Sequence, residues 1–534
     1  MRLDRLGASF PTRLSFMRRL MRAMIDESSQ VTRPVWDIDP NGHGRAVYSV
    51  GLGGHVYALI AYSQAIPDDM RTDRVIAEVW DTTYVLFDGV PTTADLDRLE
   101  SQVPLQEAGR MQPSELVLCR ANKSVRLFNH VVARLAEGQQ PDREMIRAIG
   151  YLMRTTAVYG NGKFGIADRE WIADRPVLDG PFAAEMLTVY LIRLFTHDLA
   201  DHVAKSKGGA RAVGLSADIR RHLGIGNATG LGMAPFLVNH PGLLHGWIQA
   251  RETALARVCA LPAATDPSRF HALLKRARAH VDDWSVDDAV QQARTDTLRL
   301  ELAQVEFPDG PYPFAALMDS VAGASLECQE LCAILLLEAH GDLVNPLAET
   351  MGTAPTRPFT AWQSAGEALE HLEQIYGWAM ALPLDGDHAN ALAWYVSEDK
   401  LEPRLGSRSA LTDPGQANPL DIAQQVQAFA ETLRQTGSTT SLAEVLLSHP
   451  RHRHIARRVQ ELTDLPYAEI RDNLIDEGIR PIDLLRAKLA VFGASKFDPK
   501  SDRWTRVTLF QGAPLAEEIA NGSAQDDWAF PVMP

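Results

Sequence analysis

Cysteine is scarce in this sequence. Only four cysteines occur in 534 residues, and no two of them have the Cys-x-x-Cys spacing of zinc and redox sites. Small secreted domains rely on dense cysteine frameworks, whereas a chain of this length can bury a large core without disulfides. We therefore expect a cytoplasmic protein that folds without disulfide bonds.

Long hydrophobic runs are also missing. The longest strongly apolar stretch, residues 186–195, is about half the length that a helix needs to cross a bilayer, and it contains Arg193. The apolar fraction of 46% and the charged fraction of 23% are typical of a globular protein. These features predict a protein with no membrane partner.

The chain has no excess of positive charge. Its 53 lysines and arginines are outnumbered by 68 acidic residues, which gives a formal net charge of −15. Nucleic-acid affinity depends largely on cations that displace counterions from phosphates, so we expect no nucleic-acid partner.

One segment, residues 5–25, contains no acidic residue at all. It carries several arginines, among them Arg13 and Arg18, and its leucine and methionine residues fall on one helical face. This pattern predicts an amphipathic first helix that packs on the body with its arginine heads in water. A targeting segment is the alternative.

The signatures of several enzyme classes are absent. The sequence contains no Walker loop and no Gly-x-Ser-x-Gly nucleophile motif. His197 and His202 are five residues apart, a spacing that places them on different faces of a helix and does not suit one metal ion. We expect neither a metal nor a cofactor, which leaves acid–base catalysis by ordinary side chains.

Helical periodicity dominates what the sequence does contain. Residues 45–90 include strand-like runs with short glycine or polar connections, which predict an antiparallel sheet of about four strands. Beyond them the apolar spacing is helical almost to the end. We therefore predict a mostly α (α+β) fold, a large multi-helix body with a small N-terminal sheet. The expected helices include residues 114–138, 142–158, 181–204, 241–259 and 267–281.

The length of 534 residues suggests two or three domains, and we predict three. They are an N-terminal α+β domain (1–110), a central helical domain (111–405) and a C-terminal helical region with a polar tail (406–534). The last boundary is placed at a polar stretch, residues 406–419, that is rich in glycine and proline.

One candidate anion site surrounds Arg154. The expected helix around it is apolar on nearly all faces, so a buried arginine there needs a carboxylate, carbonyl groups or an anionic ligand. The following Tyr-Gly-Asn-Gly-Lys permits a sharp bend that brings Tyr159, Asn161 and Lys163 near the helix end. We expect Arg154 and Lys163 to hold an anion and Tyr159 to act as an acid or base. A structural salt bridge, for example to Glu185, is the alternative.

The most glycine-dense stretch, residues 222–236, has the Gly-x-Gly spacing of dinucleotide loops but no buried strand before it. We therefore expect a tight loop in which Asn227 and Thr229 orient a substrate. His240 and His245 follow around the start of the next helix. With Tyr159 and Lys163 they form the set of candidate catalytic residues.

Two further clusters carry candidate substrate-binding residues. The first lies on the expected helix 114–138, where it forms either a solvated face or the wall of a cleft. The second lies near an expected helix end at residues 394–408, where a salt-bridged surface loop is the alternative. The residues concerned are Arg120, Lys123, Arg126, Tyr395, Lys400 and Arg404.

These observations favour a cytoplasmic enzyme that acts on a small anionic metabolite, carrying a carboxylate or phosphate, by non-redox acid–base chemistry of the lyase, isomerase or hydrolase type. They leave a homo-oligomer open. A helical scaffold without catalysis is one alternative, and it predicts a large exposed apolar patch and no polar-lined cavity. An oxygenase-like helical protein, with a cofactor in an apolar cavity, is the other.

Overall fold

The computed structural model describes the chain in segments. They are residue 10 and residues 12–67, 79–102, 112–159, 174–178, 180, 182–228, 241–285, 289–306, 312–351, 359–381, 383–384, 392–396, 403–407, 416–417, 419–453, 455–456, 490–493, 496–501, 504–526 and 528–533.

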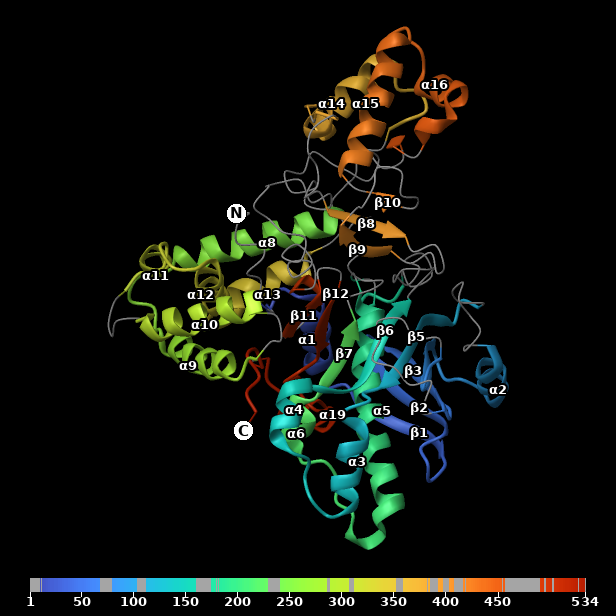
Figure 1. Cartoon of the computed structure of the whole chain (residues 1–534), viewed down its shortest axis with the longest axis vertical. Coiled ribbons are helices and arrows are strands. Elements are labelled where there is room, and N and C mark those ends of the chain that lie inside the picture. Colours follow the sequence, from blue (N-terminus) through green and yellow to red (C-terminus); the bar gives the residue numbers. More distant parts are fainter. Residues whose placement is uncertain are drawn as a thin grey trace.

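One large sheet organises these segments (Figure 1). Its strand order is β1-β2-β3-β4-β5-β6-β7-β12-β11, and only β6 and β7 pair in parallel. A second, three-stranded sheet has the order β10-β8-β9. The strands are β1 (Val31–Ile38), β2 (Gly44–Leu52), β3 (His55–Ser63), β4 (Thr82–Asp88), β5 (Glu115–Lys123), β6 (Tyr151–Tyr159), β7 (Gly224–Ala228), β8 (Leu392–Val396), β9 (Pro403–Ser407), β10 (Gln416–Ala417), β11 (Lys496–Ser501) and β12 (Trp504–Leu509).

Helices follow and interrupt these strands. They are α1 (Phe16–Asp26), α2 (Thr93–Gln102), α3 (Phe128–Ala136), α4 (Arg143–Ile149), α5 (Ala183–Gly208), α6 (Ala217–His222), α8 (Pro241–Cys259), α9 (Ser268–Asp282), α10 (Ala289–Gln304), α11 (Phe314–Ser320), α12 (Leu326–Ala339), α13 (Gly341–Glu349), α14 (Ala365–Ala381), α15 (Pro419–Gln435), α16 (Leu442–Ser448) and α19 (Ala516–Ala520).

The prediction of a mostly α fold with a small sheet of about four strands is wrong. Within the described residues the main sheet alone has nine strands, and the class is mixed α/β. The expected helix 114–138 is in fact β5 followed by α3. All residues of β5 except Arg120 are buried, so the strand lacks the polar alternation that would have identified it.

The expected helix 142–158 is also two elements. Asp142 caps α4, which ends at Ile149, and Gly150 follows in the left-handed conformation (φ 78°) that favours glycine. The chain then runs as β6 through Arg154 to Tyr159. A left-handed residue therefore ends the helix nine residues before the end that periodicity indicated.

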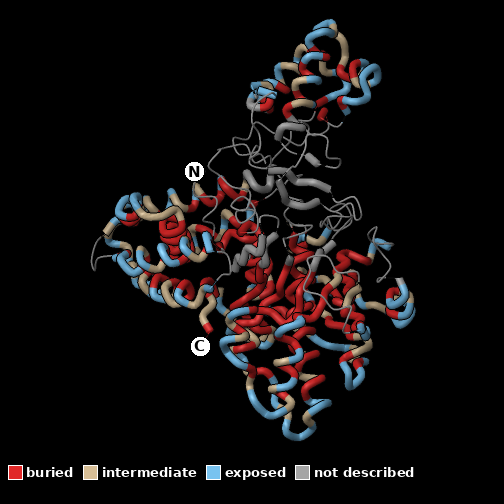
Figure 2. Tube along the Cα trace, viewed as in Figure 1, coloured by how far each residue is buried: buried red, intermediate tan, exposed pale blue. Residues whose placement is uncertain are grey.

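The long helix α5 covers one face of the main sheet. It was expected at residues 181–204 and is confirmed at Ala183–Gly208. Phe195 of α5 packs edge-on against Tyr84 and Tyr48 of the sheet, with ring centroids 5.7 and 6.4 Å apart. Figure 2 shows the sheet and α5 as the main buried region of the molecule. Burial of this apolar surface is the main stabilising contribution to the fold.

A group of helices from α8 to α13 continues the same core (Figure 1). The predicted helices 241–259 and 267–281 are confirmed as α8 and α9. Helices α14, α15 and α16 bury a separate apolar cluster. No described helix is by itself long and apolar enough to cross a membrane, although α12 and α13 pass this test together as a pair bent by 93°. The division at residues 110 and 405 stays a prediction.

The arginines of α1 are not in water as expected. Arg18 and Arg22 are 3% and 7% exposed. Arg18 binds Asp526 through Nε at 2.8 Å and also pairs with Glu338 of α12, while Arg22 pairs with Glu349 of α13. The basic face of α1 therefore joins the C-terminal segment to the helical group.

The described part of the glycine-dense stretch contains strand β7 (Gly224–Ala228) and not the expected loop. A Cβ on Gly226 of β7 would lie 2.7 Å from the ring of Tyr151 on the neighbouring strand β6. A Cβ on Gly224 would lie 2.3 Å from the backbone oxygen of Leu509 on β12. Gly224 and Gly226 therefore allow β6, β7 and β12 to pack closely, a role that needs no dinucleotide.

Gly226→Ala is expected to lower the free energy of unfolding by about 2 kcal/mol, because the added methyl group must displace the buried Tyr151 ring. The midpoint of urea unfolding measures this change. Gly51→Ala in β2 is the matched control, because nothing lies within 4 Å of its Cβ position. Equal midpoints for the two variants would contradict the packing argument.

Candidate functional site

Arg154 lies in the middle of the main sheet. It is 3% exposed, opposite Asn122 of β5 and Gly226 of β7. The prediction that it is buried is confirmed, although a strand and not a helix carries it. Asn227 lies one position along β7, where its Nδ2 donates a hydrogen bond of 2.9 Å to Oγ1 of Thr155. Asn227 therefore takes part in cross-strand pairing inside the sheet, and its expected place in a loop is corrected.

The cluster of Arg120, Lys123 and Arg126 does not form a helical face. Arg120 and Lys123 lie on β5, and Arg126 is exposed in the turn after it. Lys123 is buried, with Nζ 3.9 Å from the carboxylate of Asp81 and 5.4 Å from the centroid of the Phe128 ring. Side chains alternate across a strand, so Arg120 and Lys123, which are three residues apart on β5, lie on opposite faces of the sheet.

The cluster expected near a helix end at residues 394–408 belongs to a β-hairpin. Tyr395 of β8 lies directly opposite Arg404 of β9. Tyr159 is the last residue of β6 and His245 lies in α8. Asn161, Lys163, Thr229, His240 and Lys400 lie outside the described residues. The functional roles of all these residues stay predictions.

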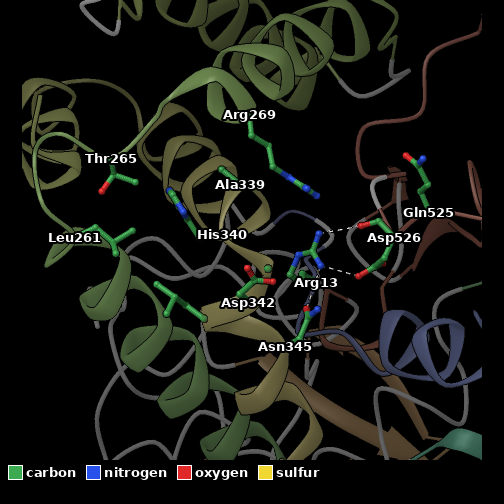
Figure 3. Close-up of a pocket in the computed structure, with 12 residues that line it drawn as sticks. Arg13, Leu261, Thr265, Arg269, Ala339, His340, Asp342, Asn345, Gln525 and Asp526 are labelled. Carbon is green, nitrogen blue, oxygen red and sulfur yellow. Dashed lines mark hydrogen bonds and ion pairs between the residues drawn. The ribbon is translucent and has the colours of Figure 1, made fainter. Parts of the chain in front are cut away.

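A different place in the fold contains a cavity of about 620 Å³. It lies where α12 turns into α13, against the segment that precedes α1 and the segment that follows α19 (Figure 3). Its lining residues are Arg13, Leu261, Thr265, Arg269, Ala339, His340, Gly341, Asp342, Leu343, Asn345, Gln525 and Asp526. Charged and amide side chains make up much of this lining, and Leu261 and Leu343 add apolar surface.

Arg13 is fixed in the cavity wall by several bonds (Figure 3). Its Nη1 donates to Oδ2 of Asp526 at 2.7 Å and to Oδ1 of Asn345 at 3.1 Å, and its Nη2 donates to the backbone oxygen of Asp526 at 2.9 Å. Burial lowers the pKa of Arg13, and Glu338 partly offsets this effect. The guanidinium is thus immobilised in the cavity wall, with the carboxylates of Asp526 and Glu338 beside it.

His340 lies at the bend between α12 and α13. Within the described part of the chain, its Nε2 is buried and has no hydrogen-bond partner. Its ring packs edge-on against Phe314, with centroids 4.8 Å apart. Burial and the charge of Arg269 lower the pKa of His340, so the imidazole is neutral at pH 7 and can donate or accept a proton.

Arg269 and Asp342 complete the charged lining. Arg269 extends from α9 in the direction of Arg13 (Figure 3), and Asp342 lies in the first turn of α13. Both side chains are exposed. Among the residues that the structure describes, neither side chain has an ion-pair or hydrogen-bond partner. Each is therefore available to a ligand.

Sequence reasoning missed this cavity because four separate stretches of the chain build it. The distance in sequence from Arg13 to Asp526 is 513 residues. The one local signal is the His-Gly-Asp sequence at residues 340–342, which interrupts an apolar helical run.

In the described segments, no group of three or more His, Cys, Asp or Glu side chains is placed to bind a metal ion. The chain matches no protein family, no curated protein and no solved structure. The function of this protein therefore has to be argued from the chemistry of its own cavity.

Proposed function

We propose that the protein binds a small anionic metabolite in the cavity at the bend between α12 and α13 and acts on it by non-redox acid–base chemistry. The observation that carries this proposal is Arg269, a cation without a partner in the described segments, which lines the same cavity as the fixed guanidinium of Arg13. Guanidinium groups bind carboxylates and phosphates in well-defined geometry.

The size and lining of the cavity support this proposal. A volume of about 620 Å³ lies within the range of roughly 300–1,000 Å³ typical of small-molecule sites. Neutral His340, with Nε2 unsatisfied among the described residues, is the candidate acid or base. A polar-lined cavity of this kind favours ligand binding over the alternative of a scaffold, which needs none.

Arg269→Ala is expected to weaken binding of such an anion about 10- to 100-fold, because one charge-assisted contact contributes roughly 1.5–3 kcal/mol. A thermal-shift screen against mono- and dicarboxylates, inorganic phosphate and sugar phosphates identifies the anion, since a ligand of the native state raises the melting temperature. Titration calorimetry then measures its Kd for both proteins.

Arg257→Ala provides the matched control. Arg257 is an exposed arginine of the neighbouring helix α8 and does not line the cavity. Both substitutions remove one positive charge, so a loss of affinity confined to Arg269→Ala supports local binding. The proposal is contradicted if both variants lose the same affinity for the anion, or if Arg269→Ala binds the anion as tightly as the unmodified protein.

A further inference from the structure

The cavity carries two opposite charges that do not neutralise each other. Arg269 and Asp342 both line it, yet no ion pair joins them. Asp342 lies inside the first turn of α13, and the N-cap position of this helix is taken by His340, whose side chain forms no cap hydrogen bond. Within the described part of the protein, no hydrogen bond or ion pair engages either side chain.

His340 lies within the electrostatic reach of both charges. After burial, Arg269 lowers the pKa of His340 and Asp342 raises it. One positive and one negative side chain of the same cavity therefore act electrostatically on the imidazole. Its buried Nε2, for which the described residues provide no partner, adds a neutral hydrogen-bonding group to these two charges.

We propose that the ligand is a zwitterion of the amino-acid class, whose anionic group binds Arg269 beside Arg13 and whose ammonium group binds Asp342. This inference rests on the proposed function and names its substrate class. A ligand with two anionic ends places one of them against Asp342, and like charges at close range are unfavourable. A simple amine is disfavoured for the same reason, because its ammonium group lies close to the positive guanidinium groups of Arg269 and Arg13.

Matched sets of probes separate these ligand classes. One set has four carbon atoms: 4-aminobutyrate as the zwitterion, succinate as the diacid, butyrate as the acid and butylamine as the amine. Homologous sets with two to six carbon atoms, together with the twenty standard amino acids, scan the spacing between the charged ends. The expected result is a rise in melting temperature with zwitterions of one spacing, and none with the matched diacid or amine.

Asp342→Asn tests the residue itself. We expect it to weaken binding of the selected zwitterion at least 10-fold, and to leave binding of the matched acid unchanged or stronger. Asp319→Asn, at an exposed aspartate of α11 outside the cavity, is the control and should leave both affinities unchanged. Equal melting temperatures of the unliganded variants show that folding is intact.

The outcomes distinguish the two proposals. If diacids or phosphates stabilise the protein and zwitterions do not, the zwitterion inference is overturned while the anion site stands. If zwitterions bind Asp342→Asn as tightly as the unmodified chain, Asp342 is not the ammonium ligand and the inference is again overturned. If no probe in either screen binds, both the inference and the proposed function fail.

Discussion

Arg193→Met is expected to lower the free energy of unfolding by about 4 kcal/mol. Arg193 of α5 is fully buried, and among the described residues its guanidinium donates to backbone carbonyl groups and to no carboxylate. Burial lowers its pKa to about 10, which is still well above neutral pH, so the group stays charged. Its five acceptors are the backbone oxygens of Leu223, Arg220, Arg221, Ala513 and Pro514, at 2.8 to 3.3 Å.

The size of this effect follows from what the substitution leaves behind. Methionine fills much of the volume of arginine, but it removes every donor from a group of carbonyls that water cannot easily reach. These carbonyls come from the end of α6 and from the segment after β12, so two distant parts of the chain lose a common attachment to α5.

Chemical denaturation monitored by circular dichroism measures the loss. Arg193→Lys keeps the charge but has three donors where arginine has five, so we expect it to lose about half as much stability. Arg257→Met at the exposed position on α8 should change stability by less than about 0.5 kcal/mol. The carbonyl argument fails if Arg193→Met and Arg257→Met unfold at the same denaturant concentration.

The second large effect concerns the buried ion pair between Arg251 of α8 and Glu330 of α12. Both side chains are nearly inaccessible, at 1% and 3% exposure. Burial acts to lower the pKa of Arg251, but the carboxylates of Glu330 and Glu252 outweigh it and the net pKa is raised. Glu330→Gln is therefore expected to destabilise the protein by about 3–4 kcal/mol, because it leaves a buried guanidinium without its main counter-charge.

A double-mutant cycle checks this interpretation. Arg251→Met combined with Glu330→Leu removes both charges and fills the space with apolar groups, so we expect it to recover most of the stability that either single change loses. Unfolding free energies of the four proteins give the coupling energy. If the double variant loses the sum of the two single losses, the two groups act independently and the ion pair has no special role.

The fold was only partly predictable, and β5 shows why. Apolar residues such as Leu118, Ala121 and Phe128 match a helical spacing, yet the first two belong to a strand and the third to the helix after it. A central strand that is covered on both faces has no polar alternation, so its sequence resembles that of a buried helix. By contrast, α5, α8 and α9 were predicted correctly because each is long and carries its own helical pattern.

The sequence predicted the chemistry of the candidate site, an arginine-lined anion site, but not the residues that form it. The burial of Arg154 was inferred from the apolar residues around it, an argument that holds in a strand as well as in a helix. Arg269 and Asp342 gave no such signal, because each is an ordinary exposed charge in its own segment. Only the tertiary structure brings them to one cavity with His340.

Arg13 and Asp526, which are 513 residues apart in the sequence, contact each other in the finished fold, and long-range contacts of this kind form late in biosynthesis. Strand β7 can pair with β12 only after the ribosome has added more than two hundred further residues. At roughly 5–20 residues per second this synthesis takes on the order of tens of seconds. The ion pairs of Arg13 and Arg18 with Asp526 can form only later still, after Asp526 has been synthesised. Throughout that interval the nascent chain carries an open sheet edge, which is prone to pairing with other chains. A chaperone that shields nascent chains would therefore have its greatest effect on this protein before synthesis ends.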